Sequence, residues 1–408
     1  MSCTLKKVAT YKAKSIYTMF DYRFCVHKDG NMYMYCSNHE IAVLGPDGSV
    51  TKHELFGSPF GQDYGIYPAP IIMEHYLVHP RVSDNFHPRA SDNFHLVVTD
   101  LNLNVLWTKE TKGWRLYVKP LNANRFVYAS VAGANELNAF CVDVLGKECW
   151  HYVNADDHLE ENVKVFIEQI IPLPDGRVVL HVRYAELDND NDNMNDEYII
   201  LDEDGKVRKR IMPELPKELK SSFRPAALSE LIVGDDDLIC IVNRYQVKKW
   251  TEATPNVGEV IILDNEYNVV YQNISNKWLD LHMTLHRNYL IYRLSAHDVF
   301  TGNAIYAFDY VTGESKELGK ELMSSPRKAK SYGENLLMVT SVWDKLPVWG
   351  KNNKTASVIT YFDGNYERIF EHKAPGDVIT AEIKNGYLYY NTTKQVCVYK
   401  IEGAAIFS

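Results

Sequence analysis

YIILDEDGKVRKRI, residues 198–211, is an apolar run that ends in Asp202, followed at once by a turn containing Gly205 and by a second run. An Asp at the end of a strand can accept hydrogen bonds from the backbone of the turn that follows it. Gly or Asn can take up the positive φ that a tight turn between antiparallel strands needs. The stretch therefore predicts a β-hairpin.

The same pattern recurs along the chain. The other apolar runs that end in Asp are HLVVTD (95–100), AFCVD (139–143), VIILD (260–264), IYAFD (305–309) and VITYFD (358–363). From the first run to the last, the Asp residues are about 53 residues apart on average, a period typical of propeller blades. Two looser copies, EIAVLGPDGSVTKHEL (40–55) and QVCVYKI (395–401), extend the repeat to both ends and bring the number of units to eight.

Two further strands precede each hairpin, as in FIEQIIPLPDGRVVLHV (166–182). Four antiparallel strands repeated eight times predict an all-β fold, a single eight-bladed β-propeller domain over residues 1–408. The eighth unit lacks a fourth strand, and TLKKVATYK (4–12) belongs to no unit. We expect this N-terminal segment to complete the last blade.

Composition narrows the classes of partner. Lys and Arg number 44 against 53 Asp and Glu, for a net charge of −9, which argues against a nucleic-acid partner. No run approaches the roughly 20 apolar residues of a membrane span, and the first twenty residues lack the apolar core of a signal peptide. We therefore expect a cytoplasmic protein without a membrane partner, whose seven scattered cysteines are reduced.

AFDYVTGE at 307–314 resembles the A-x-D-x-x-T-G core of the quinoprotein-like propeller repeat, and TDLNLNVLW (99–107) and VDVLGKECW (142–150) are looser versions. The resemblance implies a propeller fold. For the dehydrogenases of that superfamily it also implies a quinone cofactor beside a vicinal disulfide. Because this chain has no adjacent cysteines, we carry over no cofactor and no catalytic residue.

Loop lengths distinguish the two faces of the predicted propeller. The turns between strands one and two and between strands three and four are short, whereas the connections on the other face include 79–95, 185–197, 244–258, 295–303 and 342–355. Long loops on one face of a rigid scaffold commonly carry function. Large aromatic residues in these loops could cover the blades or form a contact surface for a partner, and we take them as the candidate partner-binding residues: Phe86, Phe94, Trp250, Phe300, Trp343 and Trp349.

Two loop segments contain residue types that bind metals. Asp188, Asp190, Asp192 and Asp196 place oxygens at positions 1, 3, 5 and 9, as in a calcium loop, although a solvated Asn/Asp-rich loop has the same composition. The tandem RVSDNFHP (81–88) and RASDNFHL (89–96) brings His79, His87 and His95 into one segment, which we interpret as a solvated insertion. Calcium is thus the one possible cofactor.

The sequence contains no G-x-S-x-G, H-E-x-x-H or G-x-x-x-x-G-K-[ST] motif. It therefore favours a non-catalytic interaction module, such as a subunit, an adaptor or an immunity-type inhibitor, that binds a partner protein through the long-loop face. The alternative is a propeller enzyme, such as a hydrolase or lyase that acts on glycans, with acids and histidines converging at the channel mouth on the same face.

Overall fold

The computed structural model describes most of the chain. The described residues are 3–12, 23–36, 39–55, 58–59, 69–82, 94–111, 116–132, 136–154, 163–186, 194–213, 217, 223–225, 230–234, 238–247, 257–275, 278, 284–294, 303–321, 329–343 and 355–403. Within them, no helix is long and apolar enough to cross a membrane.

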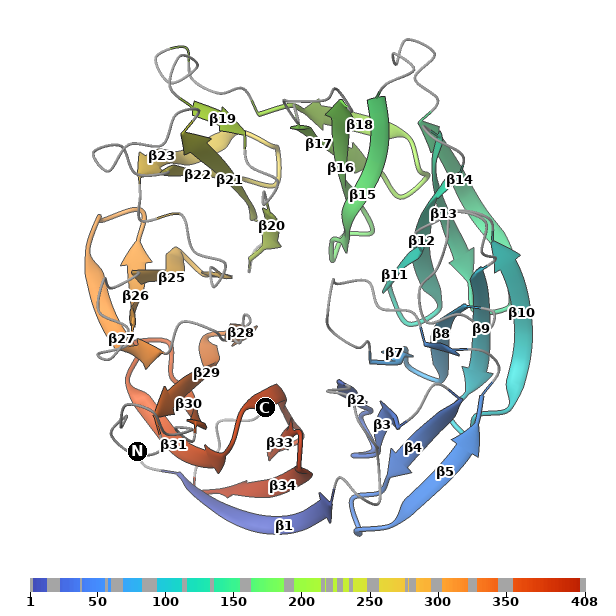
Figure 1. Ribbon diagram of the computed structural model, residues 1–408, viewed down its shortest axis with the longest axis vertical. Helices are drawn as coiled ribbons and strands as arrows, with labels where there is room; N and C mark the ends of the chain where they lie inside the picture. Colours follow the sequence, from blue (N-terminus) through green and yellow to red (C-terminus); the bar gives the residue numbers. More distant parts are fainter. Residues whose placement is uncertain are drawn as a thin grey trace, which may run out of the picture.

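The described strands form eight antiparallel sheets arranged in a ring, and the chain is an eight-bladed β-propeller (Figure 1). Blade 1 contains β2 (Phe24–Val26), β3 (Met32–Tyr35), β4 (Glu40–Leu44) and β5 (Val50–Glu54). Blade 2 contains β6 (Ser58–Pro59), β7 (Ile71–Ile72), β8 (Tyr76–Val82), β9 (Phe94–Asp100) and β10 (Val105–Thr111). Blade 3 contains β11 (Leu116–Pro120), β12 (Arg125–Ala132), β13 (Glu136–Asp143) and β14 (Glu148–Asn154). Blade 4 contains β15 (Val163–Pro172), β16 (Val178–Glu186), β17 (Met194–Leu201) and β18 (Val207–Ile211).

The remaining four blades continue the ring in chain order. Blade 5 contains β19 (Phe223–Pro225), β20 (Glu230–Val233), β21 (Ile239–Val247), β22 (Val257–Leu263) and β23 (Val269–Ser275). Blade 6 contains β24 (Thr284–His286), β25 (Tyr289–Leu294), β26 (Asn303–Asp309) and β27 (Ser315–Glu321). Blade 7 contains β28 (Ala329–Tyr332), β29 (Asn335–Trp343), β30 (Thr355–Phe362) and β31 (Arg368–Pro375). Blade 8 contains β32 (Val378–Lys384), β33 (Tyr387–Thr392), β34 (Gln395–Glu402) and the N-terminal β1 (Thr4–Lys12).

The N-terminal strand closes the ring, as the sequence predicted. β1 pairs antiparallel with β34 and is the outermost strand of blade 8 (Figure 1). The Tyr11 side chain is 4% exposed, and its hydroxyl donates a hydrogen bond to the Gly45 carbonyl of blade 1. At the other end of the strand, the Cys3 amide donates to the Ile369 carbonyl of blade 7. The segment therefore joins three consecutive blades.

The Asp that ends the third strand organises the hairpin, which confirms the predicted turn chemistry. Asp264 is a clear example: its Oδ1 accepts from the Glu266 amide at 2.9 Å and from the Asn268 amide at 2.8 Å. The bond from the Asn268 amide holds the pKa of Asp264 below its ordinary value. Equivalent bonds to backbone amides are made by Asp100, Asp143, Asp202, Asp309 and Asp363.

The expectation that Gly or Asn takes the positive φ in these turns holds in only some of the blades. Gly occupies that position at Gly146 and Gly205, as predicted, but Leu103, Tyr267 and Tyr366 occupy it in other blades, with φ between 57° and 68°. A left-handed conformation costs a non-glycine residue about 1–2 kcal/mol. Burial offsets this cost, because Leu103 and Tyr366 are 8% and 4% exposed and pack against the preceding blade.

Two tryptophans join neighbouring blades at these turns. In blade 3, the Trp150 ring covers Gly205 of the next blade so closely that an added Cβ would lie 2.7 Å from it. In blade 2, the Trp107 Nε1 donates to the Val144 carbonyl of the blade 3 turn at 2.8 Å. Apolar clusters fill the seams between blades below these contacts. The blades are thus fixed to one another by side chains as well as by closure of the ring.

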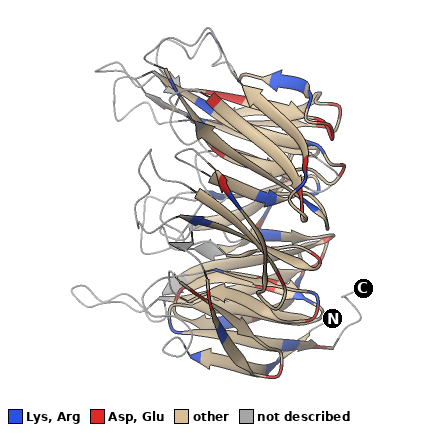
Figure 2. Cartoon of the chain, turned by 90° about the vertical axis from the view of Figure 1, so that its right-hand side faces the viewer, with Lys and Arg blue, Asp and Glu red and all other residues tan. Residues whose placement is uncertain are grey.

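Strand direction assigns every connection to a face. The turns within hairpins, such as 101–104, 144–147, 202–206 and 264–268, lie on one face, which is also where β1 begins and β34 ends (Figure 2). At the opposite face the second strand of each blade ends and the third begins, as at Val82 and Phe94, Val247 and Val257, and Trp343 and Thr355. We call the two sides the short-turn face and the long-loop face.

Candidate functional site

Most of the predicted partner-binding residues lie outside the described residues, namely Phe86, Trp250, Phe300 and Trp349. Trp343 is the last residue of β29, at the long-loop face, and its side chain is not among those described. The sequence had placed Trp343 in the loop 342–355, whereas the structure places its backbone at the end of the strand.

Phe94 does not belong to an exposed contact surface. It is the first residue of β9, opposite Val82 of β8, and its side chain is fully buried. Side chains alternate between the faces of a strand, so Phe94 shares one face with Leu96 and Val98, and all three pack in the same apolar cluster. Because the strand begins one residue earlier than expected, Phe94 belongs to the core and not to the loop.

The calcium-loop hypothesis is only partly within the described residues, since Asp188, Asp190 and Asp192 lie outside them. Asp196 lies in β17 and its side chain is 7% exposed. Its Oδ1 is 3.0 Å from His181 Nε2 and accepts from Arg183 Nε at 2.9 Å. These contacts account for its burial. Among the described residues, no group of three or more His, Cys, Asp or Glu side chains could hold a metal ion.

Two histidines of the tandem segment lie in the paired strands β8 and β9. His79 is fully buried in β8, with Nδ1 3.0 Å from the Tyr35 hydroxyl and Nε2 3.2 Å from Thr99 Oγ1. Burial and the neighbouring Arg81 lower the pKa of His79 to about 3, so its imidazole is neutral. His95 lies in β9, and His87 is outside the described residues.

Buried polar side chains gather beneath the long-loop face. They occur on second and third strands, in the half of each strand nearer to that face, at Ser130, Asn138, Arg183, Glu197, Glu259, Ser341, Ser357 and Asn391. Buried polar groups cost free energy unless they are hydrogen-bonded, so their partners show what this layer does.

Glu197 is the centre of the network between blades 3 and 4. Its two carboxylate oxygens accept from Arg210 Nη1 at 2.9 and 3.0 Å, and Oε2 also accepts from the Tyr184 hydroxyl at 2.7 Å. Arg210 Nη2 donates across the seam to the Tyr152 hydroxyl at 3.0 Å and to Asn154 Oδ1 at 2.9 Å. Burial and the bond to Glu197 raise the pKa of Tyr184, which stays a neutral donor.

Glu259 has a comparable position in blade 5, where it is 1% exposed. Its oxygens accept from the Tyr245 hydroxyl at 2.6 Å, from Asn243 Nδ2 at 3.0 Å and from Gln272 Nε2 at 2.8 Å. On the facing side of blade 4, Arg183 pairs with Asp196 and also with Glu168 at 3.1 Å. Each of these acids is therefore held by donors of its own blade, and Arg210 extends the Glu197 network across the seam to blade 3.

Such an arrangement makes a rigid platform. Carboxylates fixed by Arg, Tyr and Asn donors hold the strand ends in one position, and a satisfied polar network specifies a single packing of the blades. Asp196, Glu197 and Glu259 are almost completely excluded from solvent, so a substrate could not contact them unless the blades separated. Sequence reasoning missed Glu197 and Glu259, and the one available signal was that Glu259 is a lone acid directly before the apolar run 260–263.

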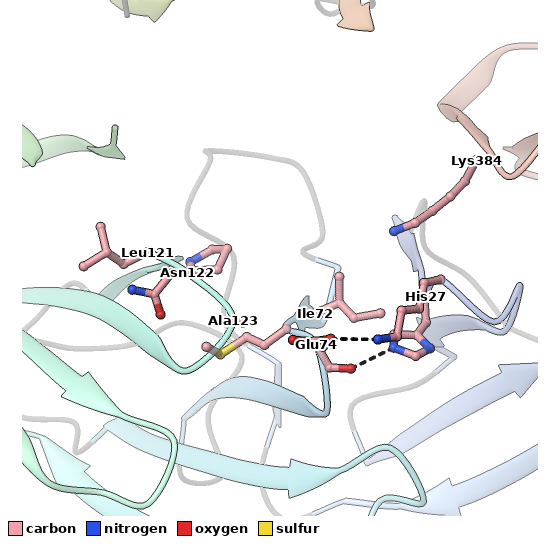
Figure 3. Close-up of a pocket in the computed structure, with 10 residues that line it drawn as sticks. His27, Ile72, Glu74, Leu121, Asn122, Ala123 and Lys384 are labelled. Atoms are coloured by element: carbon pink, nitrogen blue, oxygen red, sulfur yellow. Dashed lines mark hydrogen bonds and ion pairs between the residues drawn. The ribbon is translucent and has the colours of Figure 1, made fainter. Parts of the chain in front are cut away.

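A separate cavity opens at the central channel on the short-turn face (Figure 3). It has a volume of about 460 Å³ and lies where the innermost strands of blades 8, 1, 2 and 3 end. Its lining consists of His27, Lys28, Ile72, Met73, Glu74, Pro120, Leu121, Asn122, Ala123 and Lys384. This site could not be predicted from the sequence, because its residues lie in short turns and at strand ends that only the closed ring brings together.

The fold defines the class of protein: the chain is an eight-bladed β-propeller, the architecture that the resemblance of AFDYVTGE to quinoprotein-like repeats implied. No protein-family model matches the sequence, and no curated protein matches it either.

Several solved structures are similar to the chain. BamB from Moraxella catarrhalis has a TM-score of 0.48 and 13% identity, over 97% of this chain and 100% of that chain. The polysaccharide lyase Uly1 has a TM-score of 0.49 and 9% identity, over 95% and 90%. The acylaminoacyl peptidase of Pyrococcus horikoshii has a TM-score of 0.46 and 10% identity, over 79% of this chain and 48% of that chain. At identities of 9–13%, the likeness concerns the fold alone.

Proposed function

We propose that this protein is a non-catalytic interaction module that binds a partner protein through its long-loop face. The observation that carries the proposal is the one-sided distribution of the connections: 83–93, 187–193, 248–256, 295–302 and 344–354 all join strands that end at that face. Loops on a rigid scaffold are well suited to recognition, because the scaffold fixes their ends and leaves their sequences free to vary.

The buried layer beneath the face supports the same proposal. A partner that binds a preorganised surface loses less conformational entropy on association than one that must order it. The networks of Glu197 and Glu259 hold the strand ends of blades 3 to 5 through bonds between neutral and charged side chains. These acids serve the scaffold, which disfavours the alternative of a hydrolase or lyase using them as catalytic groups.

Affinity purification of the tagged protein from its native cells, followed by quantitative binding measurements with the captured partner, tests this function. Because a few large rings usually carry most of the affinity of an interface, Trp250→Ala or Trp343→Ala should weaken the complex by about 2 kcal/mol, or roughly thirtyfold. The folded state should persist in both variants.

The control is an apolar side chain on the opposite face. Leu145, in the blade 3 turn 144–147, is 77% exposed, so Leu145→Ala removes an accessible hydrophobic group without disturbing the core. Binding should be unchanged in this variant. If Leu145→Ala weakens the complex while both Trp variants bind normally, the partner uses the short-turn face or the outer rim, and the proposal is wrong.

A further inference from the structure

The channel-mouth cavity is independent of the proposed function, since it lies on the short-turn face. Four consecutive blades contribute to it: the turns at 27–31, 73–75 and 121–124 and the end of β32. Its volume of about 460 Å³ falls in the range of about 300–1,000 Å³ that is typical of small-molecule sites. The chemistry of its lining indicates what it could hold.

One of the two lysines at the cavity is already neutralised. Lys28 Nζ donates to Glu74 Oε1 at 2.8 Å, and this hydrogen bond, together with the charge of Lys28, holds the pKa of Glu74 below its ordinary value. Glu74 also accepts through its backbone carbonyl from His27 Nε2 at 2.9 Å, which fixes the imidazole in the wall. This side of the cavity therefore presents an ion pair with little net charge.

Lys384 is different, because its ammonium group carries positive charge into the cavity and forms no ion pair with a described residue. Its Nζ donates to the Val26 carbonyl at 2.8 Å, and in the described part of the chain no carboxylate lies within 4.0 Å of it. The bond to Val26 joins blade 8 to blade 1, but it uses one of the three N–H donors of the ammonium group. Figure 3 shows the Lys384 side chain extending from its strand toward the open space above His27 and Ile72.

The rest of the wall is apolar, with one polar exception. Ile72, Met73, Pro120, Leu121 and Ala123 supply hydrocarbon surface between Lys384 and the far side of the cavity.

The exception is Asn122, which stands at that far side. Its Oδ1 accepts from the Asn124 amide at 2.9 Å, and this leaves its Nδ2 as a second donor for a ligand. A partly buried cation, an apolar wall and an amide donor fit a molecule with one anionic end and an apolar body.

We propose that the channel-mouth cavity binds a small organic carboxylate whose anionic group pairs with Lys384 and whose aliphatic or aromatic body contacts Ile72 and Leu121. A carboxylate fits better than a phosphate or a nucleotide, because phosphate sites usually supply several cationic or backbone N–H donors and this cavity offers one uncompensated ammonium group. A single ion pair against an apolar wall corresponds to weak binding, in the micromolar to millimolar range.

Isothermal titration calorimetry with sodium hexanoate tests the proposal, with hexylamine and 1-hexanol as matched cationic and neutral probes. Hexanoate should bind saturably with a stoichiometry near one, and neither of the other two probes should bind comparably. Absence of saturable hexanoate binding at tens of millimolar, or equal binding of hexylamine, would overturn the proposal.

Two variants locate the site. Lys384→Met should weaken hexanoate binding at least tenfold. Since that change also removes the bond to Val26, Ala123→Glu provides a second variant, which places a carboxylate at the wall, leaves the Val26 bond in place and should also weaken binding at least tenfold. Lys147→Met, an exposed lysine in the blade 3 turn of the same face, should bind as the wild type does. Binding that survives both site variants would place hexanoate elsewhere and refute the assignment.

Discussion

Removal of residues 1–12 should abolish the closed ring. Eight residues of β1 align with residues of β34, and β34 is apolar and buried at Val396, Cys397 and Val398. Without β1, the backbone groups of β34 would form an exposed sheet edge, which is a template for aggregation. We therefore expect the truncated protein to aggregate or to be strongly destabilised.

The free energy of unfolding that would be lost with β1 can be estimated, starting from Tyr11. Its ring is 4% exposed between blades 8 and 1, so its burial contributes about 2 kcal/mol, and the hydroxyl bond to Gly45 adds about 1 kcal/mol. The paired backbone of β1 adds several bonds of about 1 kcal/mol each. The total exceeds about 5 kcal/mol, which is comparable with the whole stability of many domains.

Graded variants separate these contributions in a thermal or urea unfolding experiment. Tyr11→Phe should destabilise the protein by about 1 kcal/mol and Tyr11→Ala by about 3 kcal/mol. Lys6→Ala, at an exposed position of the same strand, should change stability by less than about 0.5 kcal/mol. A truncated protein that remains monomeric and unfolds like the full chain would show that β1 does not close the ring.

Three further outcomes are expected. Arg210→Met should destabilise the protein by about 2 kcal/mol. This loss is smaller than that expected for a fully buried ion pair, because the Arg210 side chain is 41% exposed. Adding Glu197→Gln to this variant should recover at least half of the lost stability in the same unfolding assay. The pKa of His79 is lowered to about 3 in the folded protein, so between about pH 6.5 and pH 3 only the unfolded chain binds a proton at this residue. The free energy of unfolding should therefore decrease by up to about 1.4 kcal/mol for each unit by which the pH is lowered. His79→Gln should remove this dependence, and pH profiles that run parallel in the variant and the wild type would contradict the assignment. If the 188–196 loop binds calcium, the ion should raise the melting temperature and Asp190→Ala should remove the increase, whereas no shift and no heat at millimolar calcium would end the hypothesis.

The sequence by itself determined the repeat and its hairpins. An Asp that accepts bonds from the backbone amides two and four residues later, as Asp264 does, involves only one short segment, so the turn can be recognised without knowledge of the rest of the fold. Repetition of this local unit then predicted the number of blades, and the unpaired strand at the N-terminus predicted the closure. Each of these features follows from short-range hydrogen bonding or from counting.

Tertiary structure alone decided where individual side chains lie. Phe94 is buried because its strand begins one residue earlier than the loop composition indicated, and Leu103 accepts a left-handed backbone because the neighbouring blade buries its side chain. The bond from Lys384 to Val26 joins residues at opposite ends of the chain, and it forms only when the ring closes. Contacts of this kind depend on packing between blades, and a residue's type and position in the sequence do not indicate which distant residue it will contact.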